Sequence, residues 1–170
     1  MREKKVIIIF ILSLFLFNYA TCKYSFKDVS PIPIEIKNFR VQQLGNKAQY
    51  INPQLSPNLT EKLKQKIINT TRLLQINDDD ADYDISGYIS QYSTSTVNIT
   101  NGESGINRLT VGFHLIFKNN KDDKKNFEAD VSRNEDFAAT KSLQEAENEI
   151  TERLIKNLAD EIFNKIFSNW

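Results

Sequence analysis

Among its 170 residues the sequence has one cysteine, one histidine, five glycines and four prolines. A single cysteine cannot form an intramolecular disulfide, so an exported fold of this chain must depend on its hydrophobic core. The lack of a glycine-rich phosphate loop and of a second histidine leaves little for catalysis. We therefore expect a protein that is not an enzyme, with no catalytic residue, cofactor or metal site. The 22 basic residues match the 22 acidic ones, which argues against a nucleic-acid partner.

The N-terminus carries the one long apolar run of the chain. A basic head is followed by an apolar run from Val6 to Phe17, which only Ser13 interrupts. Cys22 lies a few residues after the end of this run. This order is typical of a secretory signal, and the run is shorter than the roughly 20 residues that a membrane-spanning helix needs. We expect residues 1–21 to be a lipoprotein signal peptide, Cys22 to be lipidated, and residues 22–30 to form a tether. Ordinary secretion, with Cys22 ending the signal, is the alternative.

The next part of the chain predicts a strand, a helix and a second strand. Pro31 to Phe39 alternates apolar and polar residues, as a half-buried strand does. A helix is expected to begin with Ser56 as the N-cap and to end near Thr71, because Leu59, Leu63 and Ile67 recur every four residues on one face. Asp84 to Tyr92 predicts a second strand, and the polar residues from Ser93 to Ile106 predict a loop.

The remaining elements are a hairpin and a long helix. Residues 108–118 alternate strictly. The odd-numbered residues from Leu109 to Phe117 are apolar and share one face, whereas the even-numbered ones, among them Thr110 and His114, share the other. A short polar turn leads to a fourth strand at residues 126–131, and Ser142 and Glu145 fit a capping box at the start of the last helix. We expect an α+β fold in the order β-α-β-β-β-α. Two helices would pack on one face of a four-stranded mixed or antiparallel sheet, in a single domain of residues 31–170.

Two features have a chemical and a plain interpretation. The acidic residues from Asp78 to Asp84 could be a calcium loop, but they lack the glycine and the glutamate that an EF-hand needs, so a solvated turn is the favoured interpretation. His114 could be a general base, but nothing in the sequence implies a partner to orient it, so we expect a surface histidine.

The mature part of the chain resembles the LptE family of lipopolysaccharide-assembly lipoproteins, in the form found in Bacteroidetes-type bacteria. The resemblance is carried by short motifs that occur in order along the chain. They are Tyr24-Ser25-Phe26, Ile34 to Phe39, Pro53 to Ser56, Leu59 to Leu63, Gly87-Tyr88-Ile89 with Tyr92, Asn107 to Thr110, Ile162 to Asn164, and Asn169-Trp170. Departures from the usual lipidation motif are Tyr19 and Thr21, and Lys23 stands where glycine is common.

The resemblance implies a location and partners. Such proteins are held in the outer membrane by an acyl anchor, face the periplasm, and plug and help to assemble the β-barrel translocon that inserts lipopolysaccharide at the cell surface. Our candidates for lipopolysaccharide binding are Arg108, Lys118 and Arg133, because guanidinium and ammonium groups bind phosphate. Candidates for contact with the barrel are Arg108, Thr110 and His114. The alternative is a lipid-anchored periplasmic binding or inhibitor module that acts through a loop at residues 93–105.

Overall fold

The computed structural model describes residues 32–97 and 105–168. Its elements are β1 (Asn38–Val41), β2 (Gly45–Asn46), α2 (Leu55–Thr70), β3 (Leu74–Gln75), β4 (Tyr83–Val97), β5 (Ile106–Asn119), the 3₁₀ helix η2 (Asp123–Lys125), β6 (Phe127–Ala138) and α3 (Leu143–Phe167). The expected signal peptide, Cys22, the tether and Trp170 lie outside the described residues.

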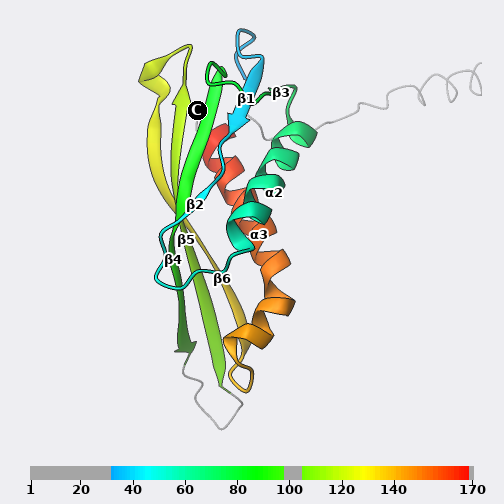
Figure 1. Ribbon diagram of the computed structural model, residues 1–170, viewed down its shortest axis with the longest axis vertical. Helices are drawn as coiled ribbons and strands as arrows, with labels where there is room; N and C mark the ends of the chain where they lie inside the picture. The colour runs from blue at the N-terminus through cyan, green and yellow to red at the C-terminus, as the bar shows by residue number, and fades with distance from the viewer. Residues whose placement is uncertain (1–31, 98–104, 169–170) are drawn as a thin grey trace, which may run out of the picture.

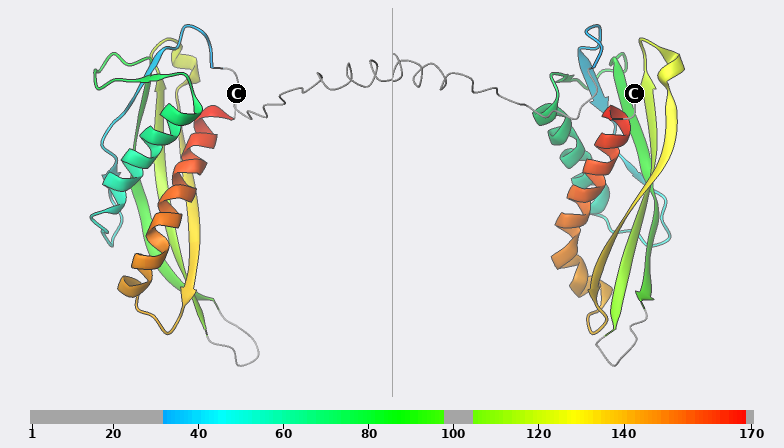
Figure 2. Two further views of the ribbon diagram at one scale, coloured as in Figure 1. Left: turned by 90° about the vertical axis from the view of Figure 1, so that its right-hand side faces the viewer. Right: turned by 180° about the vertical axis from the view of Figure 1, so that it is seen from behind.

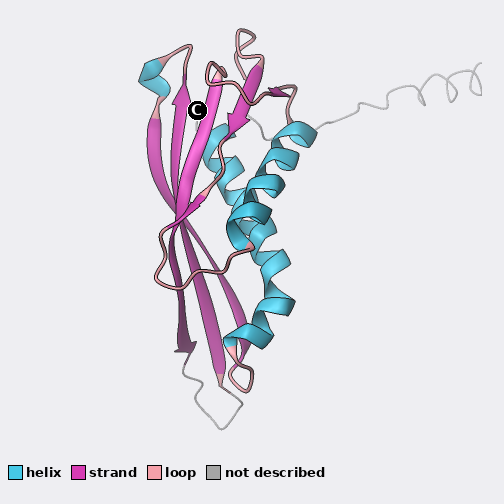
Figure 3. Cartoon of the chain, in the orientation of Figure 1, coloured by secondary structure: helices cyan, strands magenta, loops and turns pink. Residues whose placement is uncertain are grey.

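The molecule has two layers, with both helices on the same face of one mixed sheet (Figures 1 and 3). The strand order is β3-β1-β4-β5-β6, and β2 pairs separately with β4. Strands β4, β5 and β6 are antiparallel neighbours, whereas β1 and β2 each run parallel to β4. The predicted α+β class is confirmed. The sheet has six strands rather than four, because the two-residue strands β2 and β3 have no hydrophobic pattern of their own.

The first strand begins later than its alternation predicts. In place of a strand from Pro31, a turn closes where the Ile36 amide donates to the Pro33 carbonyl at 3.0 Å. Proline has no amide hydrogen to donate to a ladder, which favours this turn over a longer strand. Ile34 consequently points outward and is 87% exposed, whereas Ile36 is buried. β1 itself begins at Asn38.

Helix α2 has the predicted apolar face but a different start. Leu59, Leu63 and Ile67 are all fully buried, as predicted. Ser56 is not the N-cap, since that position falls to Gln54. The Ser56 hydroxyl is instead buried and donates to the Gly45 carbonyl at 3.0 Å, which ties α2 to β2.

Strand β4 runs through the segment expected to be a loop, as far as Val97. Its serine and threonine residues pair with β5 in continuous antiparallel register. A bulge at Ser90, which has no partner between the pairs Ile89–Phe113 and Gln91–Gly112, changes the alternation of the strand. Both Ile89 and Tyr92 are therefore buried although they are three residues apart.

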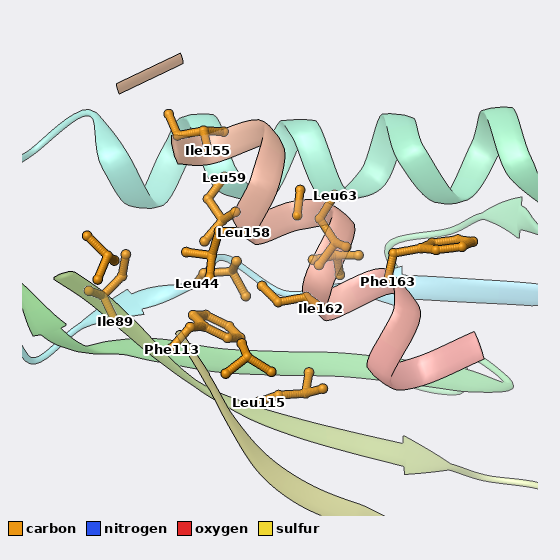
Figure 4. Packing of buried hydrophobic residues seen from close by; sticks show 14 of the residues in the cluster. Leu44, Leu59, Leu63, Ile89, Phe113, Leu115, Ile155, Leu158, Ile162 and Phe163 are labelled. Carbon is orange, nitrogen blue, oxygen red and sulfur yellow. The ribbon is translucent and has the colours of Figure 1, made fainter. Parts of the chain in front are cut away.

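One contiguous core lies between the helices and the sheet (Figure 4). The inward face of β5 is buried as predicted, and so is the stripe along α3. These residues are Leu109, Val111, Phe113, Leu115 and Phe117 of β5, with Ile150, Leu154, Leu158, Ile162 and Ile166 of α3. The capping box of Ser142 and Glu145 at the start of α3 is confirmed. Because burial of each such side chain contributes about 1.5–3 kcal/mol, this interface is the main source of stability.

Candidate functional site

Among the described residues, both α-helices lie on one face of the sheet, and its other face is turned away from them (Figure 2). We call it the open face. The side chains on it that matter below belong to Tyr88, Arg108, Thr110, His114, Glu128, Asp130 and Asp136. They come from three adjacent strands and alternate with core residues, so their positions are fixed by the backbone ladder.

Arg108 is held in a fork-shaped ion pair. It lies opposite Asp136 in the β5–β6 register, and its Nε and Nη2 atoms donate to the two Asp136 carboxylate oxygens at 2.7 and 2.8 Å. These hydrogen bonds lower the pKa of Asp136 and raise that of Arg108. Both side chains are about two-fifths exposed, so the pair adds little to stability. It does fix the direction of the guanidinium group.

His114 lies on the open face and has partners on both ring nitrogens, which the sequence did not imply. Its Nδ1 lies 2.8 Å from Asp130 and its Nε2 lies 3.1 Å from Glu128. The bond to Asp130 is the largest cause of a raised His114 pKa, and Glu128 adds to it. The Tyr88 ring lies 5.0 Å from the imidazole, and the Lys47 ammonium lies 3.8 Å from the Tyr88 ring centroid. Charges of both signs thus meet at the centre of the open face.

Thr110 lies between Arg108 and His114 in a row of small polar side chains. Its cross-strand neighbours are Ser93 on β4 and Asn134 on β6. Here the open face is polar and carries no large side chain. The structure therefore brings Arg108, Thr110 and His114 onto one surface, as expected for a shared contact.

The three cations expected to bind lipopolysaccharide do not converge. Lys118 is on the same face as Arg108 but ten residues along β5, roughly 33 Å away for an extended strand. Arg133 lies opposite the core residue Val111, on the helix side of the sheet, and makes an ion pair with Glu161 of α3. A single phosphate group cannot contact all three.

Two of the acidic residues before and within β4, Asp82 and Asp84, have structural partners. The Asp82 carboxylate accepts hydrogen bonds from the Lys37 and Asn38 backbone amides and forms an ion pair with Lys121. Burial alone would raise its pKa, but these donors outweigh burial and lower it. Asp84 is bound by Arg40. Within residues 32–97 and 105–168 no cluster of His, Cys, Asp or Glu could hold a metal ion.

The sequence analysis missed Tyr88, Glu128, Asp130 and Lys47. The first three could have been found, because β4, β5 and β6 form hairpins whose register places their alternate residues beside His114. Lys47 reaches Tyr88 only because β2 pairs with β4. A two-residue strand leaves no pattern from which that pairing could be predicted.

The fold defines an α+β protein of the kind seen in bacterial lipoproteins. A solved minor lipoprotein from Acinetobacter baumannii matches with a TM-score of 0.52 and 16% identity, over 78% of this chain and 94% of that one. A solved putative neuraminyllactose-binding hemagglutinin homolog from Helicobacter pylori matches with a TM-score of 0.53 and 14% identity, over 82% and 90%. At these identities the likeness shows the fold alone.

The chain belongs to the LptE family, described as lipopolysaccharide-assembly, whose family model matches residues 36–166. The resemblance found in the sequence is thereby confirmed. A search of curated proteins found no match. Neither α2 nor α3, the α-helices of the described residues, is long and apolar enough to cross a membrane.

Proposed function

We propose that this protein is an outer-membrane lipoprotein that plugs and helps to assemble the β-barrel translocon for lipopolysaccharide. In this proposal an acyl group on Cys22 holds the protein at the periplasmic side of the outer membrane. The protein then assists lipopolysaccharide insertion as a binding subunit and catalyses no reaction. Membership of a lipopolysaccharide-assembly family supports the proposal.

The open face is the observation that carries this proposal. Barrel lumens wide enough to hold a plug are lined by polar side chains. Polar side chains from three strands line the open face, and Arg108 and His114 on it are already paired with Asp136 and Asp130. Paired charges can be covered by a polar wall at lower cost than unpaired ones. Arg108, Thr110 and His114 are the proposed contacts with the barrel.

Lysines and arginines are the proposed contacts with lipopolysaccharide. Arg108 and Arg133 already bind the carboxylates of Asp136 and Glu161, so a phosphate would have to compete with these groups. Lys118 is exposed and makes no ion pair with another described residue. We therefore expect Lys118→Ala to weaken lipopolysaccharide binding more than Arg133→Ala does, as measured by cross-linking to the glycolipid in cells.

The barrel contact is tested by a bulky cation in the row of small polar residues. Thr110→Arg should lower the amount of barrel protein that co-purifies in mild detergent at least about tenfold, a cost near 1.4 kcal/mol. Asn164→Arg, at an exposed position of α3, is the matched control and should leave recovery unchanged. If circular dichroism shows that both variants are folded and the same amount of barrel protein co-purifies with each, the open face is excluded as the contact.

Membrane attachment is tested separately. Mass spectrometry of the N-terminal peptide of the protein extracted from cells should show a diacylglycerol-modified Cys22 as the first residue. An unmodified chain that begins beyond residue 22 would contradict the anchor.

A further inference from the structure

Three large aliphatic side chains are exposed at one end of the molecule. Ile34 is 87% exposed, Leu74 is 70% exposed and Ile68 is 46% exposed. They lie in the turn before β1, in β3 and in the last turn of α2, which Figure 1 shows at the same end. We call these three residues the apolar tip. The other large exposed apolar side chains of the described residues, Tyr50 and Ile51, lie in the connection between β2 and α2.

The tip is held in place by hydrogen bonds. The guanidinium of Arg72 donates to the carbonyls of Ile36 and Pro33, both at 2.7 Å, and to that of Ile32 at 3.1 Å. The Leu74 amide donates to the Lys37 carbonyl at 3.0 Å, which joins β3 to the end of the same turn. Arg72 thus fixes the backbone that presents Ile34 outward.

Exposure of the tip is not needed for packing. Ile36, two residues after Ile34, fills the core position of this segment and is 1% exposed. Leaving a large aliphatic side chain in water forgoes the stabilisation that its burial would contribute. A rigid turn that holds such a side chain outward therefore favours a partner that covers it.

The chain before the tip identifies the partner. Ile32 begins the described residues, and Cys22 precedes it by ten residues. Ten residues span at most about 36 Å, so an acylated Cys22 keeps this end of the molecule close to the lipid surface. The tip is made of isoleucine and leucine, whereas protein interfaces concentrate their binding energy in Trp, Tyr and Arg. We propose that the apolar tip inserts into the surface of the lipid bilayer.

This inference rests on the proposed anchor at Cys22 and adds a second attachment to it. An inserted tip is a second contact with the membrane and so fixes the long axis of the domain relative to it. Glu35 and Lys37, both exposed, lie on either side of the buried Ile36 and carry opposite charges, so they give this segment no net attraction to anionic head groups. Insertion should therefore depend on apolar contact and vary little with salt.

Depth-dependent fluorescence quenching tests the insertion. The acylated protein carrying Ile34→Cys or Leu74→Cys is labelled with bimane and placed in phosphatidylethanolamine–phosphatidylglycerol vesicles that contain brominated lipid. Quenching should be at least about threefold stronger than for Ile51→Cys, a control residue that is 60% exposed and lies between β2 and α2. Equal quenching at the three positions would overturn the proposal. A label at position 34 that is shielded without vesicles would also overturn the proposal, because it would show that the N-terminal segment of the chain covers the tip. A label that is shielded only when the barrel protein is added would overturn it in favour of a contact with the barrel.

A second measurement separates the tip from the anchor. The chain from residue 22 with Cys22→Ser lacks an acylation site, and its vesicle partition coefficient should fall at least about tenfold when Ile34→Ser and Leu74→Ser are combined. Ile51→Ser should leave it unchanged. This loss stands even if Cys22 proves to be unmodified in cells, in which case the anchor fails and the tip remains. An unchanged partition coefficient in the double variant would overturn the tip and leave the anchor standing.

Discussion

His114 gives the open face a dependence on pH at the scale of one residue. The hydrogen bond to Asp130, with that to Glu128, raises the pKa of His114 above its ordinary value of 6.5. A raised pKa in the folded state means that the folded protein holds the proton more tightly than the unfolded chain. The resulting stability is fully present below about pH 6.5 and is lost as the pH rises through the higher folded pKa.

The prediction is checked by NMR titration of the His114 ring. Asp130→Asn removes the larger of the two carboxylate interactions that raise the pKa of His114, so it should lower that pKa. Asp136→Asn is the control, because Asp136 lies on the same face but pairs with Arg108, and it should leave the pKa of His114 unchanged. A pKa that does not respond to Asp130→Asn would show that the ion pair is absent in solution.

Arg40 allows a comparison of a buried and an exposed ion pair at one guanidinium. It binds Asp84, whose side chain is 8% exposed, and Asp79, whose side chain is 96% exposed. Asp84→Ala should lower the free energy of unfolding in urea by about 2–3 kcal/mol, because it leaves a largely buried guanidinium with only the exposed Asp79 as a partner. Asp79→Ala should cost less than about 0.5 kcal/mol. Similar costs for the two variants would show that burial does not decide the strength of this pair.

Individual site residues were predictable where alternation alone decides their direction. Thr110 and His114 lie on the face opposite Phe113, as the pattern of β5 predicts. The partners of His114 were not predicted, because they depend on the β5–β6 register. The side of the sheet that carries Arg133 depends on the same register, since Arg133 lies opposite the core residue Val111.

At the scale of the element, Gly87 lets β4 and β5 approach closely. Its φ is 155°, and a Cβ at this position would lie 2.2 Å from the His114 carbonyl oxygen and 2.6 Å from the Phe113 ring. Gly87→Ala should therefore lower the free energy of unfolding by at least about 2 kcal/mol. Gly45→Ala is the control, since its added Cβ would lie 3.3 Å from the Tyr88 Cβ. Equal denaturation midpoints for the two variants would contradict this account.

Elements were predicted where the periodicity is long, and they were missed where a contact between distant parts of the chain decides the structure. α3 and β5 follow their patterns closely, with the capping box of Ser142 in place. The polar residues after Tyr92 predict a loop, whereas the serines and threonines among them pair with β5 as far as Val97. Ser56 resembles an N-cap, but its hydroxyl binds Gly45 across the fold, and no local pattern contains that contact.

At the scale of the whole molecule, the proposed function makes a prediction in cells. Depletion of the protein should increase sensitivity to large hydrophobic antibiotics, because fewer working translocons would leave the outer surface short of lipopolysaccharide. Re-expression of the wild-type chain or of Asn164→Arg should restore resistance, whereas Thr110→Arg should restore it poorly. Full rescue by Thr110→Arg would separate the open face from the barrier function. Unchanged sensitivity on depletion would contradict the proposed role itself.

The position of α3 after every strand that it covers has a consequence for export. Ten of its residues are buried against the rest of the core. In the proposed location the chain would cross the inner membrane amino end first, so the apolar face of its sheet would be exposed to the periplasm until this helix follows. Its yield should then depend on holdase chaperones more steeply than its final stability would suggest.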